Sequence, residues 1–247
     1  MDSKLRTPNS ELRTIFQGKN SLEEILLQLT LDGVPSSPKK ILFRGEGTGE
    51  TSSYVAGWMA GRGMDVIVLD GANRFNPYIA SSFARKALIS PEKILKRIRI
   101  ARAFTCYQMA TLMGEQLPSL LKEERATVPT KKPWVILLGP ITTFLDEDVP
   151  EREIRPLFER SLKKTEEMVL RGIPFFLFQP SVPSDSRRAY LTKRLSQFSN
   201  WVWRIELGDK EPKIILERGI EVKNIIENCK LQNEQWKFRK RISFSCR

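Results

Sequence analysis

Histidine is absent from the chain, and its absence narrows the chemistry that the protein has available. Histidine titrates near neutral pH and is the commonest protein ligand of metal ions. We therefore exclude histidine-based acid–base catalysis and histidine-ligated metal sites. Cysteine is scarce as well: Cys106, Cys229 and Cys246 are far apart and lack the spacing of a metal site. They are typical of reduced thiols in an intracellular protein.

Long apolar runs are also missing. No stretch reaches the roughly 18 apolar residues that a membrane-spanning helix requires. Residues 1–14, MDSKLRTPNSELRT, are polar and do not resemble a signal peptide. These features predict a protein with no membrane partner that is located in the cytoplasm, or in the nucleus of a eukaryotic cell.

Positive charge is abundant. The chain has 247 residues, of which 41 are lysine or arginine and 29 are aspartate or glutamate, giving a formal net charge of +12. An excess of this size suits a polyanion such as nucleic acid or an anionic membrane surface, and we favour nucleic acid. The alternative is a basic surface that serves solubility or an acidic protein partner.

Short apolar runs alternate with helical patterns, which is typical of an α/β domain whose sheet is mainly parallel. The middle of the chain, about 78–125, is mostly helical, and 123–133 is a charged loop. The predicted strands are 40–43, 66–70, 134–138, 173–178, 201–207 and 213–217, with a short strand ending at Ile100. The predicted helices include 22–29, 51–62 and 151–171. The last two strands form a hairpin.

Three segments follow from this pattern. Residues 1–20 form a flexible N-terminal arm, 21–220 form one core domain, and 221–247 form a basic C-terminal tail. The length and the 40% hydrophobic content suffice for one core of this size.

A glycine-rich turn, Arg44–Thr51 (RGEGTGET), joins the strand 40–43 to the helix 51–62. A phosphate loop uses such glycines to direct backbone N–H groups at phosphate oxygens, and the following helix adds its positive end. The active motif, G-x-x-x-x-G-K-[ST], also supplies a lysine for the phosphates and a hydroxyl for Mg²⁺. Here Arg44 stands at the first glycine and Glu50 at the lysine. The alternative is a plain glycine turn.

Several further segments resemble the RecA family, especially the ATPase core of archaeal and eukaryotic strand-exchange recombinases and their paralogs. The most specific is Ile100–Phe104 (IARAF), followed by Gln108. Residues 21–35 and 69–77 resemble the family's lead-in to the phosphate loop and the segment after its second strand. The resemblance covers about 21–219. It implies a RecA-like P-loop NTPase core, with a mostly parallel central sheet flanked by helices and a C-terminal β-hairpin.

The departures from the family pattern fall on its chemical residues. The resemblance places the Walker A lysine at Glu50, the catalytic glutamate at Ala72 and the Walker B aspartate at Gly139. In the family these residues bind phosphate, activate water and hold Mg²⁺. Losing all three predicts a pseudoenzyme without catalytic residues or a bound metal. The alternative is a divergent ATPase that uses Asp70 or the cluster Asp146–Asp148, although acids commonly stand in such a loop or helix start.

A vestigial or weak nucleotide site remains a prediction of the resemblance. Its residues are Gly45, Gly47, Thr48, Gly49, Thr51, Ser52 and, at the family's sensor position, Gln179. We expect no cofactor, and bound ATP with Mg²⁺ is the alternative.

The family binds DNA through loops beyond its strand ends, and the second of these loops corresponds to 181–200. The predicted DNA-binding residues there are Arg187, Arg188, Lys193 and Arg194, with Tyr190 and Phe198 among them. The alternative is an amphipathic helix with Tyr190, Leu191 and Leu195 facing the core. The tail adds Lys237, Arg239, Lys240 and Arg241.

The resemblance therefore implies a non-catalytic recombinase paralog in recombination or repair. Its expected partners are DNA, single-stranded, and a RecA-family subunit or a second copy of the chain, because subunits of this family stack through the nucleotide site. The remaining alternative is a scaffold or regulator that does not bind DNA.

Overall fold

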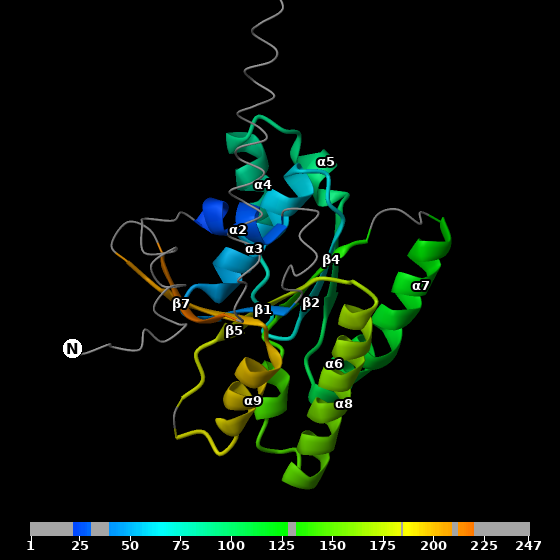
Figure 1. Cartoon of the computed structure of the whole chain (residues 1–247), viewed down its shortest axis with the longest axis vertical. Helices are drawn as coiled ribbons and strands as arrows, with labels where there is room; N and C mark the ends of the chain where they lie inside the picture. Colours follow the sequence, from blue (N-terminus) through cyan, green and yellow to red (C-terminus); the bar gives the residue numbers. More distant parts are fainter. Residues whose placement is uncertain (1–21, 31–39, 128–131, 184, 209–211, 220–247) are drawn as a thin grey trace, which may run out of the picture. The chain divides into compact units, whose positions relative to one another are not determined.

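A computed structural model describes residues 22–30, 40–127, 132–183, 185–208 and 212–219 (Figure 1). The chain divides into one unit of residues 38–218 and another of residues 1–37 and 219–247. In the second unit the predicted helix is present as α2 (Leu22–Thr30). The predicted arm and tail lie outside the described residues, and with them Lys237, Arg239, Lys240 and Arg241.

Unit 38–218 is built on one seven-stranded sheet with the order β3-β2-β4-β5-β1-β6-β7. The pairs β1–β5, β1–β6, β2–β3, β2–β4 and β4–β5 are all parallel. The bounds are β1 Lys40–Gly45, β2 Val66–Asp70, β3 Ile98–Arg102, β4 Trp134–Leu138, β5 Phe175–Pro180, β6 Trp201–Glu206 and β7 Lys213–Gly219. The predicted mostly parallel α/β sheet is confirmed.

The last two strands form the predicted hairpin. β7 lies beside β6 at the edge of the sheet, after only the connection 207–212. A parallel crossover needs about a dozen residues, so a connection of this length joins antiparallel neighbours.

The central strands are buried on both faces, as strands of a parallel sheet covered by helices should be. Every residue of β2 is buried, and so are the residues of β5 from Phe175 to Gln179. The apolar runs within them, 66–69 and 175–178, are the pattern that made the strands predictable from the sequence.

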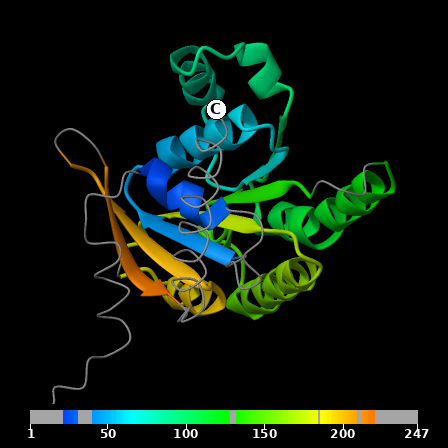
Figure 2. The same ribbon diagram turned by 45° about the horizontal axis from the view of Figure 1, so that its top comes forward.

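Helices cover the two faces of this sheet (Figures 1 and 2). One face carries α3 (Thr48–Gly61), α4 (Pro77–Lys86) and α5 (Pro91–Leu95). The other carries α6 (Cys106–Thr111), α7 (Leu117–Thr127), α8 (Glu151–Leu170) and α9 (Tyr190–Phe198). On this second face Leu42, Leu137 and Val202 from the strands pack with Phe158 and Leu191 from the helices.

The observed helices test two interpretations made from the sequence, the loop at 123–133 and the segment 181–200. The loop predicted for 123–133 is wrong at its start, because α7 continues to Thr127 after a π-helical turn, Leu112–Gln116 (η1). Pro118 is the second residue of α7, directly after the π-helical turn, and the helix continues past it. In 181–200 the amphipathic helix is present as α9, with Leu191 and Leu195 fully buried. Tyr190, which this interpretation also directed towards the core, is 39% exposed, so that part of it is wrong.

Candidate functional site

The carboxyl ends of β1, β2, β4 and β5 lie at one edge of the sheet, because these strands are parallel. Gly45 is paired with Pro180, and Asp70 with Leu138. Open α/β sheets bind ligands at this edge. The three departures from the family motif gather here: Glu50 follows β1, Ala72 follows β2, and Gly139 directly follows β4.

The glycine turn after β1 is packed tightly against β6. Gly45 has φ of 118°, and a Cβ atom on it would collide with the carbonyl oxygen of Ile205. That oxygen also accepts the N–H of Glu46 at 3.2 Å. Gly47 is the N-cap of α3. The turn therefore joins a strand to a helix through glycines, and it directs one of its N–H groups at β6.

The first turn of α3 directs its hydroxyl groups inward. Thr51 Oγ1 donates to the carbonyl of Gly47 at 2.8 Å, and Ser52 Oγ donates to that of Gly49 at 2.8 Å. Thr48 is buried too, whereas Glu50 is exposed. A carboxylate at a helix N-terminus interacts favourably with the helix dipole, which accounts for Glu50 without a ligand. It also places negative charge at the position to which the resemblance assigns the lysine of a phosphate loop.

Arg74 covers the same turn from the β2 side. A Cβ atom on Gly49 would lie 2.9 Å from the Cβ of Arg74. The loop that carries Arg74 is held by Asp70, which is fully buried and accepts the N–H groups of Arg74 at 3.2 Å and Phe75 at 2.9 Å. Arg102 Nε lies 3.7 Å from the same carboxylate. Asp70 thus anchors the loop that carries Arg74, and the positive charge of Arg102 offsets its negative charge.

Gly139 and Ala72 are packed against each other. Gly139 has φ of 65°, and a Cβ atom there would lie 2.6 Å from the Cβ of Ala72 and 2.6 Å from Oγ1 of Thr142. Ala72 N–H donates to the carbonyl of Leu138 at 3.3 Å. The backbone at the end of β4 therefore leaves no room for an aspartate at position 139.

Gln179, at the end of β5, is buried with 2% of its surface exposed. Its Oε1 accepts the N–H of Ile141 at 3.1 Å, and its Nε2 donates to the carbonyl of Pro180 at 3.0 Å. The side chain links the loop after β4 to the end of β5, and both of its polar groups are used in doing so.

The acidic cluster Asp146–Asp148 is exposed, and it forms a turn before α8. Asp146 Oδ1 accepts the N–H of Asp148 at 3.1 Å. Within the described ranges, no group of three or more His, Cys, Asp or Glu side chains is arranged to hold a metal ion.

The predicted DNA-binding residues between β5 and the end of α9 separate into two kinds. Arg188 is 5% exposed; its guanidinium donates to the carbonyls of Phe144 at 2.9 Å, Asp146 and Val149, and its Nε pairs with Glu151 at 3.1 Å. These bonds tie the segment before α9 to the loop after β4. They leave Arg188 poorly placed for a phosphate contact.

Arg194 is also engaged within the chain. It forms a two-pronged pair with Glu159 on α8, at 2.8 and 2.9 Å, and the hydrogen bonds to that carboxylate raise the pKa of Arg194. Arg187 and Lys193, by contrast, are exposed. The structure therefore offers two of the four predicted cations to a ligand.

The two aromatic residues of this segment are engaged in a similar way. Tyr190 donates its hydroxyl to Glu151 Oε1 at 2.5 Å, and burial together with this bond raises the pKa of Tyr190 to about 12. Lys40 Nζ lies 4.4 Å from the centre of the Phe198 ring. Glu151, at the start of α8, thus holds both Arg188 and Tyr190.

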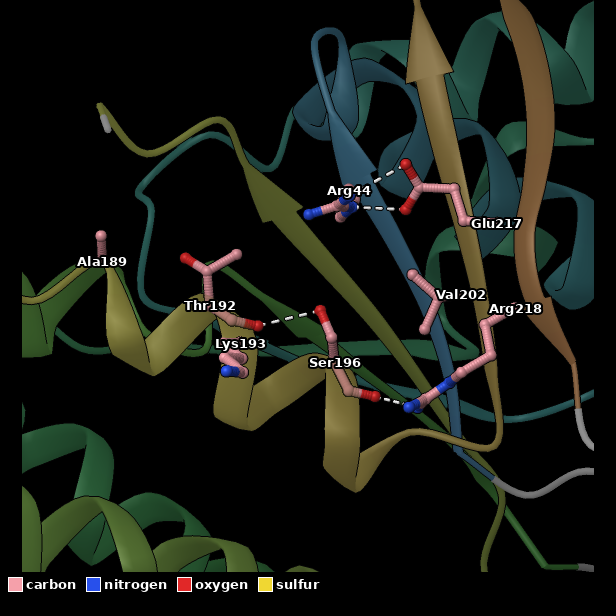
Figure 3. A pocket seen from close by; sticks show the side chains of 8 residues that line it. All are labelled: Arg44, Ala189, Thr192, Lys193, Ser196, Val202, Glu217 and Arg218. Atoms are coloured by element: carbon pink, nitrogen blue, oxygen red, sulfur yellow. Dashed lines mark hydrogen bonds and ion pairs between the residues drawn. The ribbon is translucent and has the colours of Figure 1, made fainter.

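Sequence reasoning missed a hollow of about 420 Å³ beside α9, which we call the α9 hollow (Figure 3). It is lined by Arg44, Ala189, Thr192, Lys193, Ser196, Val202, Glu217 and Arg218. Arg44 pairs with Glu217 through two bonds, Nε to Oε2 at 2.6 Å and Nη2 to Oε1 at 2.9 Å. The hydrogen bond to Glu217 raises the pKa of Arg44.

Comparison with models of known protein families and with curated proteins finds no match to this chain. In the described part of the chain, no helix combines the length and the apolar character needed to span a membrane.

Proposed function

We propose that the chain is a non-catalytic RecA-like recombinase paralog, which binds single-stranded DNA and a partner subunit in recombination or repair. The observation that carries the proposal is the combination at the carboxyl edge of the sheet. A glycine turn leads from β1 into α3, and Glu50, Ala72 and Gly139 stand where the resemblance places the family's chemical residues.

The loss of catalysis is supported by the fit of these residues to ATP and Mg²⁺. Phosphoryl transfer depends on positioned positive charge and on a bound metal. Glu50 puts a carboxylate at the N-terminus of α3, and the hydroxyl of Thr51 is turned to the carbonyl of Gly47. Gly139 has no room for a metal-binding carboxylate. These residues do not fit the ATP–Mg²⁺ complex, so we derive no step that uses it.

The DNA part of the proposal is supported by charge and exposure. The net charge is +12, and the segment after β5 presents Arg187 and Lys193 to solvent. Lysine and arginine that neutralise phosphates release counterions, so such binding weakens steeply with salt.

The partner is supported by the lateral edge of the sheet that β3 forms. β3 is the last strand on its side within the described residues, and an edge strand offers unpaired backbone groups to another chain. Ile100 on β3 is 42% exposed, and Phe104 just after it is 66% exposed. Exposed apolar residues beside a free strand edge are suited to a protein contact.

The experiment is fluorescence anisotropy with labelled single-stranded and duplex oligonucleotides over a series of salt concentrations. We expect tighter binding to the single strand and a steep loss of affinity as salt rises. An absence of binding to either oligonucleotide at low salt would refute the DNA part of the proposal. Analytical ultracentrifugation of the chain alone tests self-association independently.

A further inference from the structure

The α9 hollow concentrates positive charge that the sequence distributes over distant positions. Arg44 comes from the end of β1, Lys193 from α9 and Arg218 from β7, and the single carboxylate in the lining is Glu217 (Figure 3). Arg44 reaches this place because it points to the same face of the sheet as Leu42, two residues earlier, which packs in the core with α9. Arg44, which stands at the first position of the phosphate-loop motif, therefore faces away from the glycine turn.

The three cations differ in how many of their hydrogen-bond donors are already used within the chain. Arg218 donates to the carbonyls of Ser196 and Ser199, the latter at 2.6 Å, and so holds the end of α9. Arg44 uses Nε and Nη2 for Glu217, and neither bond involves Nη1; Figure 3 shows one guanidinium nitrogen directed away from Glu217. Lys193 is exposed at the rim. Arg44 and Lys193 are thus the groups with donors to offer.

The dimensions and the position of the hollow indicate what it takes. Its volume of about 420 Å³ falls in the usual range of small-ligand pockets, roughly 300–1,000 Å³. Guanidinium and ammonium groups are the side chains that recognise phosphate. Ala189, which lines the hollow, is two residues after the exposed Arg187.

We propose that the α9 hollow binds a phosphodiester group of single-stranded nucleic acid, held by Lys193 and Arg44. The strand continues from there along Arg187. Glu217 limits the affinity, because its carboxylate partly neutralises Arg44; the same carboxylate lies 3.2 Å from Nε of Arg204. This inference rests on the proposed function and assigns its nucleic-acid contact to named residues outside the glycine turn.

The test compares three variants by anisotropy with a labelled single-stranded oligonucleotide over a salt series. Lys193→Ala is expected to weaken binding about two- to fivefold, as for loss of one exposed charge contact. It should also lower the salt slope by about 0.7, as for one phosphate contact on a single strand. The matched control is Lys163→Ala, which removes another exposed lysine, on α8 and outside the lining of the hollow. It should leave both quantities near those of the native chain.

The third variant, Glu217→Gln, gives the opposite sign. It keeps one acceptor oxygen for Arg44, replaces the other by an NH2 donor and removes the negative charge, and we expect binding to strengthen about two- to fivefold with a steeper salt slope. A residue that only supports the fold would not tighten binding when replaced. Thermal melting by circular dichroism confirms that each variant is folded, and Lys193→Ala decides the question if Glu217→Gln does not fold.

The outcomes separate the two proposals. If the native chain binds but Lys193→Ala behaves as Lys163→Ala, or if Glu217→Gln weakens binding, the α9 hollow is not the phosphodiester site and the proposed function remains. If the native chain does not bind single-stranded DNA at low salt, both proposals are overturned.

Discussion

Replacing Arg188 by methionine should destabilise the protein strongly without acting as the loss of a DNA contact. The guanidinium is 5% exposed and donates to three backbone carbonyls and to Glu151. Hydrogen bonds from a charged group contribute about 1.5–3 kcal/mol each, but water reaches part of this site because Glu151 is half exposed. We therefore expect the free energy of unfolding to fall by about 3–5 kcal/mol, because three backbone carbonyls lose their donor and each unsatisfied acceptor costs roughly 1–3 kcal/mol.

The assay is equilibrium unfolding in urea, with Arg187→Met as the control. Arg187 is its exposed neighbour, so this change should alter the unfolding free energy by no more than about 0.5 kcal/mol. In anisotropy with single-stranded DNA the order should reverse: Arg187→Met lowers affinity, whereas folded Arg188→Met binds nearly as the native chain. A loss of stability below about 1 kcal/mol for Arg188→Met would contradict the structural role that we assign to this residue.

Three further predictions concern the carboxyl edge and α9. Gly139→Asp should lower the free energy of unfolding by about 1–3 kcal/mol, because its Cβ would meet the Cβ of Ala72; urea unfolding measures this, and unchanged stability would contradict the packing. Glu50→Lys should increase the affinity for a fluorescent ATP analogue but produce no hydrolysis above background in a phosphate-release assay, since Ala72 and Gly139 remain; steady turnover would refute the argument. Tyr190 has a pKa raised to about 12, so its contribution to stability is present below pH 10, the ordinary pKa, and is lost as the pH rises towards 12; Tyr190→Phe should flatten the fall in melting temperature over that interval, and equal slopes would contradict it.

The strands of this fold could be predicted because their information is local. β4 is a continuous run of apolar residues, β2 is one up to its last residue, Asp70, and each strand is buried over nearly its whole length. The helix α9 was visible as one of two interpretations, since Leu191 and Leu195 are spaced as one face of a helix. The many charged residues in 181–200 favoured the other interpretation, a DNA-binding loop.

The candidate site was less predictable, because whether its side chains are paired or exposed depends on partners far along the chain. Arg188 pairs with Glu151, 37 positions away, and Arg194 pairs with Glu159, 35 positions away. No local sequence pattern therefore distinguishes these two paired arginines from the exposed Arg187 and Lys193. Arg44 and Glu217 are 173 positions apart. Only the order of the strands, with β1 between β5 and β6, brings Arg44 into the α9 hollow.

The position of the glycine turn could be predicted from the sequence, whereas its contacts could not. The sequence predicted its place between a strand and a helix, and the structure has it there. It did not indicate that the hydroxyls of Thr51 and Ser52 face helix carbonyls, or that a side chain at Gly139 would meet Ala72. These facts depend on contacts between the loops that follow β1, β2 and β4.

The central claim is that the chain binds single-stranded DNA without using a nucleotide. The most direct measurement is the dissociation constant for a labelled single strand at fixed ionic strength, with and without ATP and Mg²⁺, while phosphate release is followed in the same samples. We predict the same salt-sensitive affinity in both conditions and no release of phosphate. Binding that requires ATP, or phosphate release stimulated by DNA, would contradict the claim.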